Sequence, residues 1–348
     1  MNAQVMHSRT APATTTRPAF GTVMASTMAV ASFRDGKWST HELRKYGPIE
    51  ISPAAHALHY GSTLFEGFKA YRWADGSINI FRMDRHIARM RQSAQGLVMP
   101  EPDVALVAAM VTAVVDRVRN EVPEAPGALY LRPMLFGLGA SIGGASAPPA
   151  EAMLIVLASP VWDYFASGPK ALRIYVEEKA TRCASHLGMI KTGGNYAAAM
   201  GPTMAARQKY QVDQVLFCPG GEVQETGAAN FLLIKEGKIL TRSLDTTFLH
   251  GVTRDSLLTI APDLGFKVEE RVFTVEEMLD WVKDGEAALS GTAAVLAGVG
   301  TLVRIGNDFL ISGEWWITVF PGAALVVLVL SVNLLGDWLR DALNPKLR

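Results

Sequence analysis

The spacing of apolar residues predicts two helices directly. Between Val104 and Val118, apolar side chains recur every three or four positions, which places them on one buried face of a helix that Asp103 opens. Thr274 and Glu277 form the capping-box pair that begins a helix, and apolar residues follow this pair at once. Both segments are therefore predicted to be helices that pack against a core.

Other apolar residues gather in short runs that predict buried strands. The runs at 153–157, 215–217 and 231–234 are each flanked by Gly, Pro or polar residues. Strand-like and helix-like segments alternate along the chain, which predicts a mixed α/β (α+β) fold.

The apolar pattern breaks at 163–169, where Asp-Tyr-Phe-Ala-Ser-Gly-Pro places turn formers between two strand-like runs. We therefore expect two domains. The predicted division is a disordered tail at 1–18, a small α/β domain at 19–163, a linker at 164–170 and a larger domain at 171–303.

The two ends of the chain differ in character. The first residues are rich in Ala, Thr and Pro, which favours a disordered tail, although Arg9 and Arg17 weakly imitate an organelle transit peptide. Residues 315–336 contain no charged side chain, and this length meets the requirement of about 20 residues for a membrane-spanning helix.

Composition narrows the classes of function. The 348 residues include 33 basic and 33 acidic side chains, which argues against a basic surface for nucleic acid. Cys183 and Cys218 lie far apart, without the spacing of a disulfide framework or a metal site. A small-molecule substrate and a reducing, cytoplasmic setting are therefore expected.

Lys191 is the first candidate for chemistry. A lysine alone is usually a solvated surface charge. Here, however, Gly188-Met-Ile190 precedes the lysine and can desolvate its amine, which favours Schiff-base formation with an aldehyde. Gly193 and Gly194 follow it and leave room for a flat ring close to the backbone.

Two motifs in order resemble one family. Lys191-Thr-Gly-Gly-Asn-Tyr196 is similar to the lysine motif of branched-chain aminotransferases, which are pyridoxal 5'-phosphate (PLP) enzymes of fold type IV, and Gln224-Glu225-Thr-Gly-Ala-Ala-Asn-Phe231 resembles the second signature of that family. The resemblance implies that Lys191 is the catalytic, cofactor-holding lysine and that the domain at 171–303 binds PLP. It also implies that Tyr196 hydrogen-bonds the ring oxygen and that Glu225 pairs with the ring nitrogen.

Three further segments resemble parts of the family that bind the cofactor phosphate. In Phe81–Arg91, the resemblance implies that Arg82 reaches the phosphate, while Arg85, Arg89 and Arg91 are interpreted as an ordinary basic helix face. Gly251-Val252-Thr253-Arg254-Asp255 resembles the phosphate turn, and Ser290-Gly291-Thr292-Ala293-Ala294 resembles the remaining phosphate segment. The cofactor residues carried over from these two segments are Val252, Thr253 and Thr292.

The substrate side falls mainly in the first predicted domain. His59-Tyr60-Gly61 and Phe65-Glu66-Gly67 resemble the motif that lines the family's apolar pocket, which implies that Tyr60 and Phe65 contact the substrate. Phe65 taken alone is equally well interpreted as a core aromatic. The residues implied to orient the substrate carboxylate are Tyr130, Arg132, Thr292 and Ala293.

The resemblance implies transamination of Leu, Ile and Val with 2-oxoglutarate by a homodimer or higher homo-oligomer. Another fold type IV activity, such as a D-amino-acid aminotransferase or an aminodeoxychorismate lyase, is the nearest alternative. An inactive chimera tethered to a membrane is an alternative of a different class.

That last alternative arises because the resemblance runs only from about residue 19 to residue 303. Residues 304–348 instead resemble the last membrane helix and tail of a peptide-type ABC-transporter permease. The sequence therefore indicates a chimera. Its apolar segment either anchors the enzyme to a membrane, or it docks in place of the helix that the family would have there or hangs loose and promotes aggregation. We favour the outcome without a membrane anchor.

Overall fold

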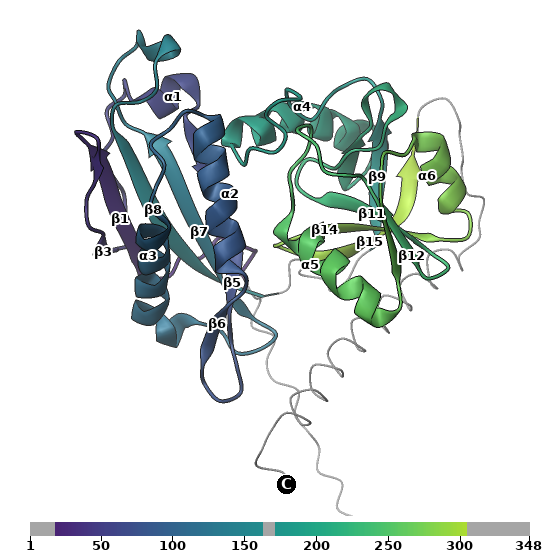
Figure 1. Ribbon diagram of the computed structural model, residues 1–348, viewed down its shortest axis with the longest axis horizontal. Helices are drawn as coiled ribbons and strands as arrows, with labels where there is room; N and C mark the ends of the chain where they lie inside the picture. Colours follow the sequence, from purple (N-terminus) through teal and green to yellow (C-terminus); the bar gives the residue numbers. More distant parts are fainter. Residues whose placement is uncertain (1–17, 163–170, 305–348) are drawn as a thin grey trace, which may run out of the picture.

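The computed structural model describes residues 18–162 and 171–304, which fold into two β-sheets with helices packed against them (Figure 1). The predicted linker, the tail up to residue 17 and the apolar segment from residue 305, with its permease resemblance, lie outside the described residues. Within the two described ranges, no helix has the length and apolar character needed to cross a bilayer.

The first sheet has eight strands and is antiparallel throughout. Its order is β2-β1-β8-β7-β5-β6, with β3 paired to β1 and β4 paired to β7. The strands are β1 (Thr27–Arg34), β2 (Lys37–Trp38), β3 (Glu42–Lys45), β4 (Thr63–Phe65), β5 (Phe68–Arg72), β6 (Ile78–Ile80), β7 (Ala128–Gly137) and β8 (Ala152–Val161).

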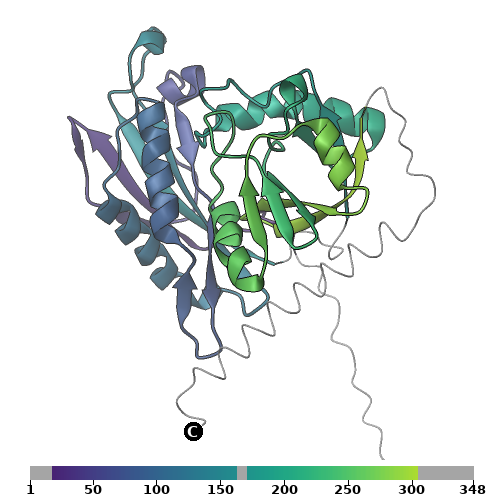
Figure 2. The same ribbon diagram turned by 45° about the vertical axis from the view of Figure 1, so that its right-hand side comes forward.

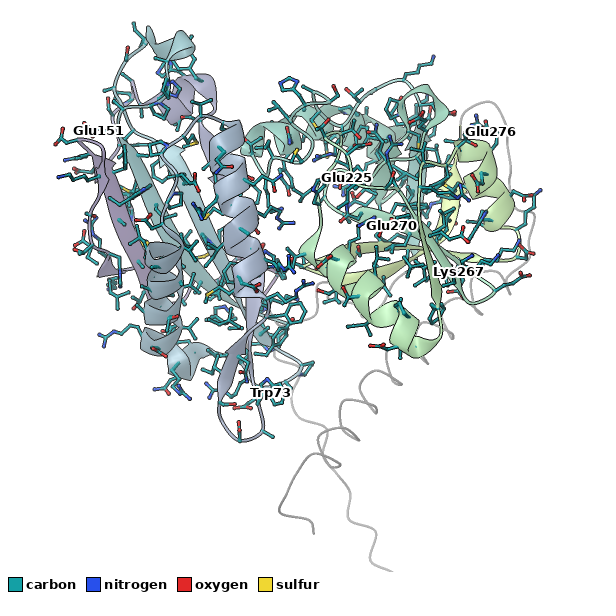
Figure 3. The ribbon with its side chains drawn as sticks, in the orientation of Figure 1. Trp73, Glu151, Glu225, Lys267, Glu270 and Glu276 are labelled. Carbon is teal, nitrogen blue, oxygen red and sulfur yellow. The ribbon has the colours of Figure 1, made fainter. Side chains whose placement is uncertain are left out.

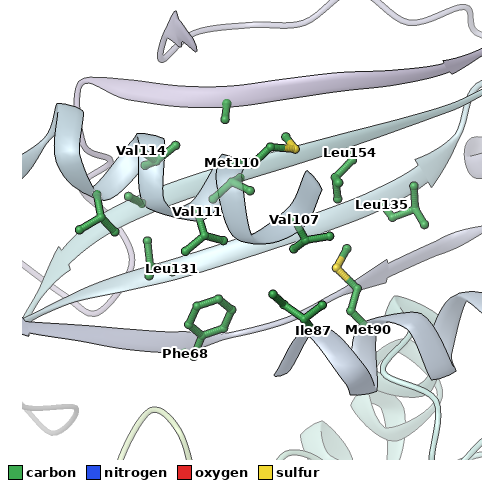
Figure 4. Packing of buried hydrophobic residues seen from close by; sticks show 14 of the residues in the cluster. Phe68, Ile87, Met90, Val107, Met110, Val111, Val114, Leu131, Leu135 and Leu154 are labelled. Atoms are coloured by element: carbon green, nitrogen blue, oxygen red, sulfur yellow. The ribbon is translucent and has the colours of Figure 1, made fainter. Parts of the chain in front are cut away.

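Helices α2 (Met83–Gly96) and α3 (Val104–Arg117) cover one face of this sheet, and the short α1 (His56–Tyr60) lies near its upper end in Figure 1. The predicted face of α3 is confirmed, because Val107, Met110, Val111 and Val114 are fully buried. Figure 4 shows these side chains packed beside Leu131, Leu135 and Leu154 of β7 and β8, with Ile87 and Met90 of α2 nearby.

The second sheet has seven strands in the order β10-β9-β15-β14-β11-β12-β13. It is mixed, since β9 pairs in parallel with β10 and β15, and β12 pairs in parallel with β13. The strands are β9 (Leu172–Glu177), β10 (Gln214–Phe217), β11 (Asn230–Lys235), β12 (Lys238–Thr241), β13 (Lys267–Glu270), β14 (Glu286–Gly291) and β15 (Val295–Val303).

The second half contains α4 (Gly193–Tyr210), α5 (Val252–Ile260) and α6 (Val275–Trp281). The capping prediction at α6 is confirmed, since the Thr274 side chain accepts a hydrogen bond from the backbone N–H of Glu277. The three predicted strands are also confirmed as parts of β8, β10 and β11. The short 3-10 turns are η1 (Arg119–Glu121), η2 (Gly144–Ser146), η3 (Pro219–Gly221) and η4 (Ala261–Leu264).

The two halves have separate hydrophobic cores but meet along defined contacts. Leu64 of β4 forms an antiparallel bridge with Thr192, immediately before α4. In the turned view of Figure 2, α2 lies on the side of the first half that faces α5. The residues at this junction come from both halves, and they include most of the predicted site.

Candidate active site

The backbone of Lys191 is anchored to the first half of the chain. Its N–H donates to Ser93 Oγ at 3.0 Å, and its carbonyl accepts from the N–H of Phe65 at 3.1 Å. Next to it, Thr192 caps α4 and also donates its hydroxyl to the carbonyl of Thr63 at 2.7 Å. The lysine is therefore fixed between a strand of one half and a helix of the other.

The Lys191 side chain lies beside two aromatic residues that the sequence predicted. Its Nζ donates to Tyr196 Oη at 2.6 Å and lies 5.0 Å from the centre of the Phe65 ring. The rings of Phe65 and Tyr196 are 5.2 Å apart. Phe65 is only partly buried and faces the amine, so it lines the site instead of filling the core.

Glu225 is buried in the second half, on the side toward α2 (Figure 3). Its Oε1 accepts from the N–H of Leu249 at 2.8 Å, and its Oε2 accepts from Asn230 Nδ2 at 3.0 Å. Arg182 Nε lies 2.8 Å from Oε1 as an ion pair that lacks hydrogen-bond geometry. Burial raises the pKa of Glu225 to about 7, although Arg182 and the Leu249 amide oppose the rise. A carboxyl group whose pKa lies near 7 can exchange a proton with a bound partner.

Arg82 stands at the start of α2 and contacts α5. Its Nη1 donates to Ser256 Oγ and its Nη2 pairs with Asp255 Oδ2, both at 2.7 Å. The guanidinium is thus already engaged by a hydroxyl and a carboxylate. Its role in phosphate binding stays a prediction.

The interpretation of Arg89 as part of a solvated basic face was wrong. Its side chain is buried, and its Nε and Nη2 donate to the two carboxylate oxygens of Glu66 at 2.7 and 2.8 Å. Its Nη1 donates to the carbonyl of His250 at 2.8 Å. Helical spacing could have indicated this burial, because Arg89 lies on the same face of α2 as the buried His86 and Ser93.

Glu66 is the second residue whose role at the site could not be seen from the sequence. Burial alone would raise its pKa, but Arg89 and then His86 outweigh burial and hold the pKa well below its usual range. Burial lowers the pKa of His86, with Glu66 opposing, and its Nδ1 donates to Glu66 Oε2 at 2.7 Å. The family-like Phe65-Glu66-Gly67 motif therefore contributes a buried anion as well as an aromatic wall.

Arg89 also lines a cleft of about 230 Å³ between α2 and α5, together with His250, Gly251 and Val252. Gly251 is the N-cap of α5 and provides no side-chain cap, so the first amides of this helix remain available to a ligand. Val252 is buried and Thr253 half-buried at this end. A helix N-terminus beside an arginine is suited to an anion.

The turn between β14 and β15 carries Thr292 and Ala293, both half-buried. Lys69 of β5 reaches across from the first half and donates to the carbonyl of Ala293 at 2.9 Å. Just before the turn, Ser290 Oγ is buried and has no hydrogen-bond partner among the described residues. The turn therefore belongs to the second half and is held in place by a lysine of the first half.

Arg132 and Tyr130 of β7 complete the side near Phe65. The Arg132 guanidinium lies 4.5 Å from the Phe65 ring centre, and its Nη2 donates to Tyr130 Oη at 3.1 Å. A Cβ on Gly67 would lie 1.8 Å from Tyr130 Oη, so any larger residue there would displace the Tyr130 ring. An arginine beside two aromatic rings can hold a carboxylate next to an apolar group.

Tyr60 does not join this group of residues. Its hydroxyl donates to the carbonyl of Ile142, and its ring lies 4.9 Å from that of His56. These contacts place it against the loop that follows β7. Its predicted contact with the substrate therefore remains a prediction.

Comparisons with known proteins identify the family of the chain. A family model described as Amino-transferase class IV matches residues 63–301. Branched-chain-amino-acid aminotransferase 5, chloroplastic, of Arabidopsis thaliana is 39% identical over 285 residues, which cover 81% of this chain and 68% of that protein. A probable branched-chain-amino-acid aminotransferase of Streptomyces coelicolor is 38% identical over 309 residues, which cover 85% and 84%.

Solved structures show the same architecture. The T.th. branched-chain amino acid aminotransferase complexed with N-(5'-phosphopyridoxyl)-L-glutamate superposes with a TM-score of 0.66 at 27% identity, covering 80% of this chain and 86% of that one. The matched family region contains Lys191, Glu225 and Arg89. The chain therefore belongs to the class IV aminotransferases and has their mixed α/β, type IV fold.

Proposed function

We propose that this protein transfers the amino group of branched-chain L-amino acids (Leu, Ile and Val) to 2-oxoglutarate with pyridoxal 5'-phosphate as cofactor. The products are branched 2-oxo acids and L-glutamate. The observation that carries the proposal is the position of Lys191 Nζ, which contacts Tyr196 Oη and the Phe65 ring at a junction that Arg132 also lines.

The residues present fit this cofactor. Ser290 Oγ is buried without a partner among the described residues, Glu225 is a buried acid with a raised pKa, and the amides at the start of α5 face a cleft. The group would be held by Lys191, Tyr196, Glu225, Val252, Thr253, Thr292 and an arginine. Because Arg89 lines the cleft at the start of α5 and Arg82 is not among the residues that line it, we assign the phosphate to Arg89 in place of Arg82.

When bound, PLP supplies an electron-withdrawing ring that stabilises negative charge beside the reacting carbon. Lys191 would hold the cofactor, and its Nζ would be the base that removes the proton from the substrate Cα. Tyr196 orients the lysine through the 2.6 Å hydrogen bond. Glu225 holds a proton near the ring nitrogen, and Arg132 orients the substrate carboxylate.

The choice of branched substrates rests on the aromatic wall and on the relatives. Phe65 and Tyr130 offer apolar surface next to the Arg132 guanidinium, whose carbon lies 4.5 and 5.3 Å from the two ring centres. The T.th. relative has also been solved with 4-methylvaleric acid, a branched carboxylic acid, at 27% identity to this chain. An apolar side chain beside an anchored carboxylate matches both observations.

We also propose a homodimer or higher homo-oligomer in the cytoplasm, with the domains divided at 164–170. Tyr60 contacts the loop near Ile142 and not the Lys191 group, and we propose that it faces the substrate site of a second copy of the chain. Membrane anchoring through 315–336, which the sequence predicts from a resemblance to a permease, stays the alternative. Sedimentation of the detergent-free protein distinguishes a dispersed oligomer from a membrane-bound form.

Activity is tested by incubating the full chain with PLP, L-leucine and 2-oxoglutarate and measuring L-glutamate. Glutamate formation is expected. Turnover of D-alanine without turnover of L-leucine would instead identify another fold type IV enzyme.

The cofactor lysine is tested by Lys191→Ala, with Lys209→Ala as its control on the exposed surface of α4. Lys191→Ala is expected to lose the visible absorbance of covalently held PLP and at least about 10³-fold of the turnover, because the base is lost. Lys209→Ala is expected to keep both. A visible band that persists in Lys191→Ala would contradict the assignment.

A further inference from the structure

A buried ionic cluster lies behind the cleft at the start of α5. Glu66, His86 and Arg89 are exposed by only 1%, 2% and 7%. Isolated ions in such a place would be costly to bury, so their mutual hydrogen bonds must compensate. The cluster lies between the first sheet and α5, which is where the two halves of the chain meet.

Glu66 fixes one edge of the Arg89 guanidinium. Its Oε1 accepts from Nε at 2.7 Å and its Oε2 accepts from Nη2 at 2.8 Å, which is the bidentate pairing that defines both position and orientation. Arg89 Nη1 donates to the carbonyl of His250, the residue immediately before the N-cap of α5. An arginine has five N–H donors, so it retains N–H groups for a ligand after these contacts.

His86 fixes Glu66 in turn. Its Nδ1 donates to Glu66 Oε2 at 2.7 Å, and its ring stacks on Phe68 with the ring centres 4.8 Å apart. Phe68 is a core residue of the first half. The contacts therefore run in order from the core through His86 and Glu66 to Arg89, and Arg89 reaches the backbone at α5.

We propose that Glu66, held by His86, is a positioning residue for the cofactor phosphate, because it fixes Arg89 against the N-terminus of α5. This inference rests on the proposed function, since it takes the PLP phosphate as the anion bound at that cleft. The change in PLP affinity that it predicts has the opposite sign to the change that charge alone would cause. Removing a negative charge near a phosphate should tighten binding, whereas loss of the fixed arginine should weaken it.

The test is to titrate PLP and unphosphorylated pyridoxal separately into the full chain and into Glu66→Gln. We expect Glu66→Gln to weaken PLP binding by about tenfold or more, the usual scale for hydrogen bonds to a charged group. The affinity for pyridoxal should change by less than about twofold, because pyridoxal has no phosphate for Arg89 to bind. The phosphorus NMR signal of bound PLP is expected to shift and broaden.

Asp84→Asn is the matched control for charge. It removes the same charge as Glu66→Gln, but from an exposed position on α2, the helix that carries Arg89. This variant should leave the ratio of PLP to pyridoxal affinity unchanged. Unchanged or tighter PLP binding in Glu66→Gln, or equal weakening of PLP and pyridoxal, would overturn the proposal.

Two changes at His86 keep the test decisive if Glu66→Gln does not fold. His86→Leu removes the donor to Glu66 and is expected to weaken PLP binding selectively. His86→Asn places an amide N–H near the position of Nδ1 and is expected to restore most of the affinity. Equal affinities in the two variants would contradict the role of His86. Absence of PLP binding in the unmodified chain would instead reject the proposed function itself.

Discussion

Two buried glutamates in this protein show how hydrogen-bond geometry sets the charge of a residue. Glu66 receives a bidentate arginine and an imidazole, which lower its pKa despite complete burial. Glu225 also lies beside an arginine, but Arg182 makes no hydrogen bond to it, and burial prevails. The first carboxylate is a permanent anion, and the second can exchange a proton near neutral pH.

Glu225 therefore makes the stability of the cofactor-free protein depend on pH. Its folded pKa of about 7 exceeds the unfolded value of about 4.3, so the folded chain binds the proton more tightly. The free energy of unfolding should fall by about 2–3 kcal/mol as pH rises from about 5 to 8 through this group alone. Glu225→Gln should remove this part of the fall, as measured by urea unfolding at both pH values. If the free energy of unfolding depended equally on pH in both proteins, this contribution of Glu225 would be refuted.

For single residues, the sequence was most informative where a motif includes the residues that would carry out the reaction. The resemblance selected Lys191, Tyr196 and Phe65, and the structure brings these three together. Arg89 was missed because its partner Glu66 lies on a different element, 23 residues away. In a sequence, charged residues spaced along a helix are interpreted as solvent-exposed, because the distant partner that would pair with a buried charge cannot be seen.

At the level of elements, the turn before α4 decides where Lys191 lies. A Cβ at Gly188 would lie 2.0 Å from the carbonyl carbon of Thr247, so the two backbones approach more closely than any other residue allows. Arg182 Nη2 donates to the Gly188 carbonyl at 2.7 Å, and the N–H of Met189 donates to the carbonyl of Thr246 at 3.2 Å. This tight contact holds the lysine segment against the loop that leads to α5.

Gly188→Ala should separate these two segments. We expect a loss of about 1–3 kcal/mol in the free energy of unfolding from overpacking, together with weaker PLP binding. Gly143→Ala is the matched control, because the nearest atom to a Cβ there is Ser141 Oγ at 3.9 Å. The control should change stability by no more than about 1 kcal/mol, and in the favourable direction. Denaturant titration of both variants is the measurement, and similar effects would contradict the argument.

Periodicity predicted elements well but not their arrangement. The face of α3, the cap of α6 and parts of β8, β10 and β11 follow from neighbouring residues, so local sequence suffices for them. The order of the second sheet depends on pairings between distant segments, such as β15 with β9. No local pattern specifies which distant strand becomes a neighbour.

At the scale of the whole molecule, the site exists only while both halves stay together. Phe65, Lys69 and Arg89 belong to the first half, and they contact Lys191, Ala293 and His250 of the second. A ligand that binds this junction therefore stabilises both halves at once.

Saturation with PLP provides the corresponding test. At a free concentration about 100 times Kd, the free energy of unfolding should rise by about 2.7 kcal/mol. Hydrogen exchange should slow together in β7 of the first half and β14 of the second, because each supports one side of the junction. Protection confined to β14 would show that the halves bind the cofactor independently.

The position of β15 has a consequence for the synthesis of the chain. This strand lies between β9 and β14, yet it leaves the ribosome after both of them. Until residue 303 has emerged, the nascent second sheet exposes two strand edges, and such edges readily pair with other chains. Insertion of β15 closes both edges at once and completes the turn that carries Thr292. The protein therefore acquires its protection from misassembly and its finished active site in the same late event.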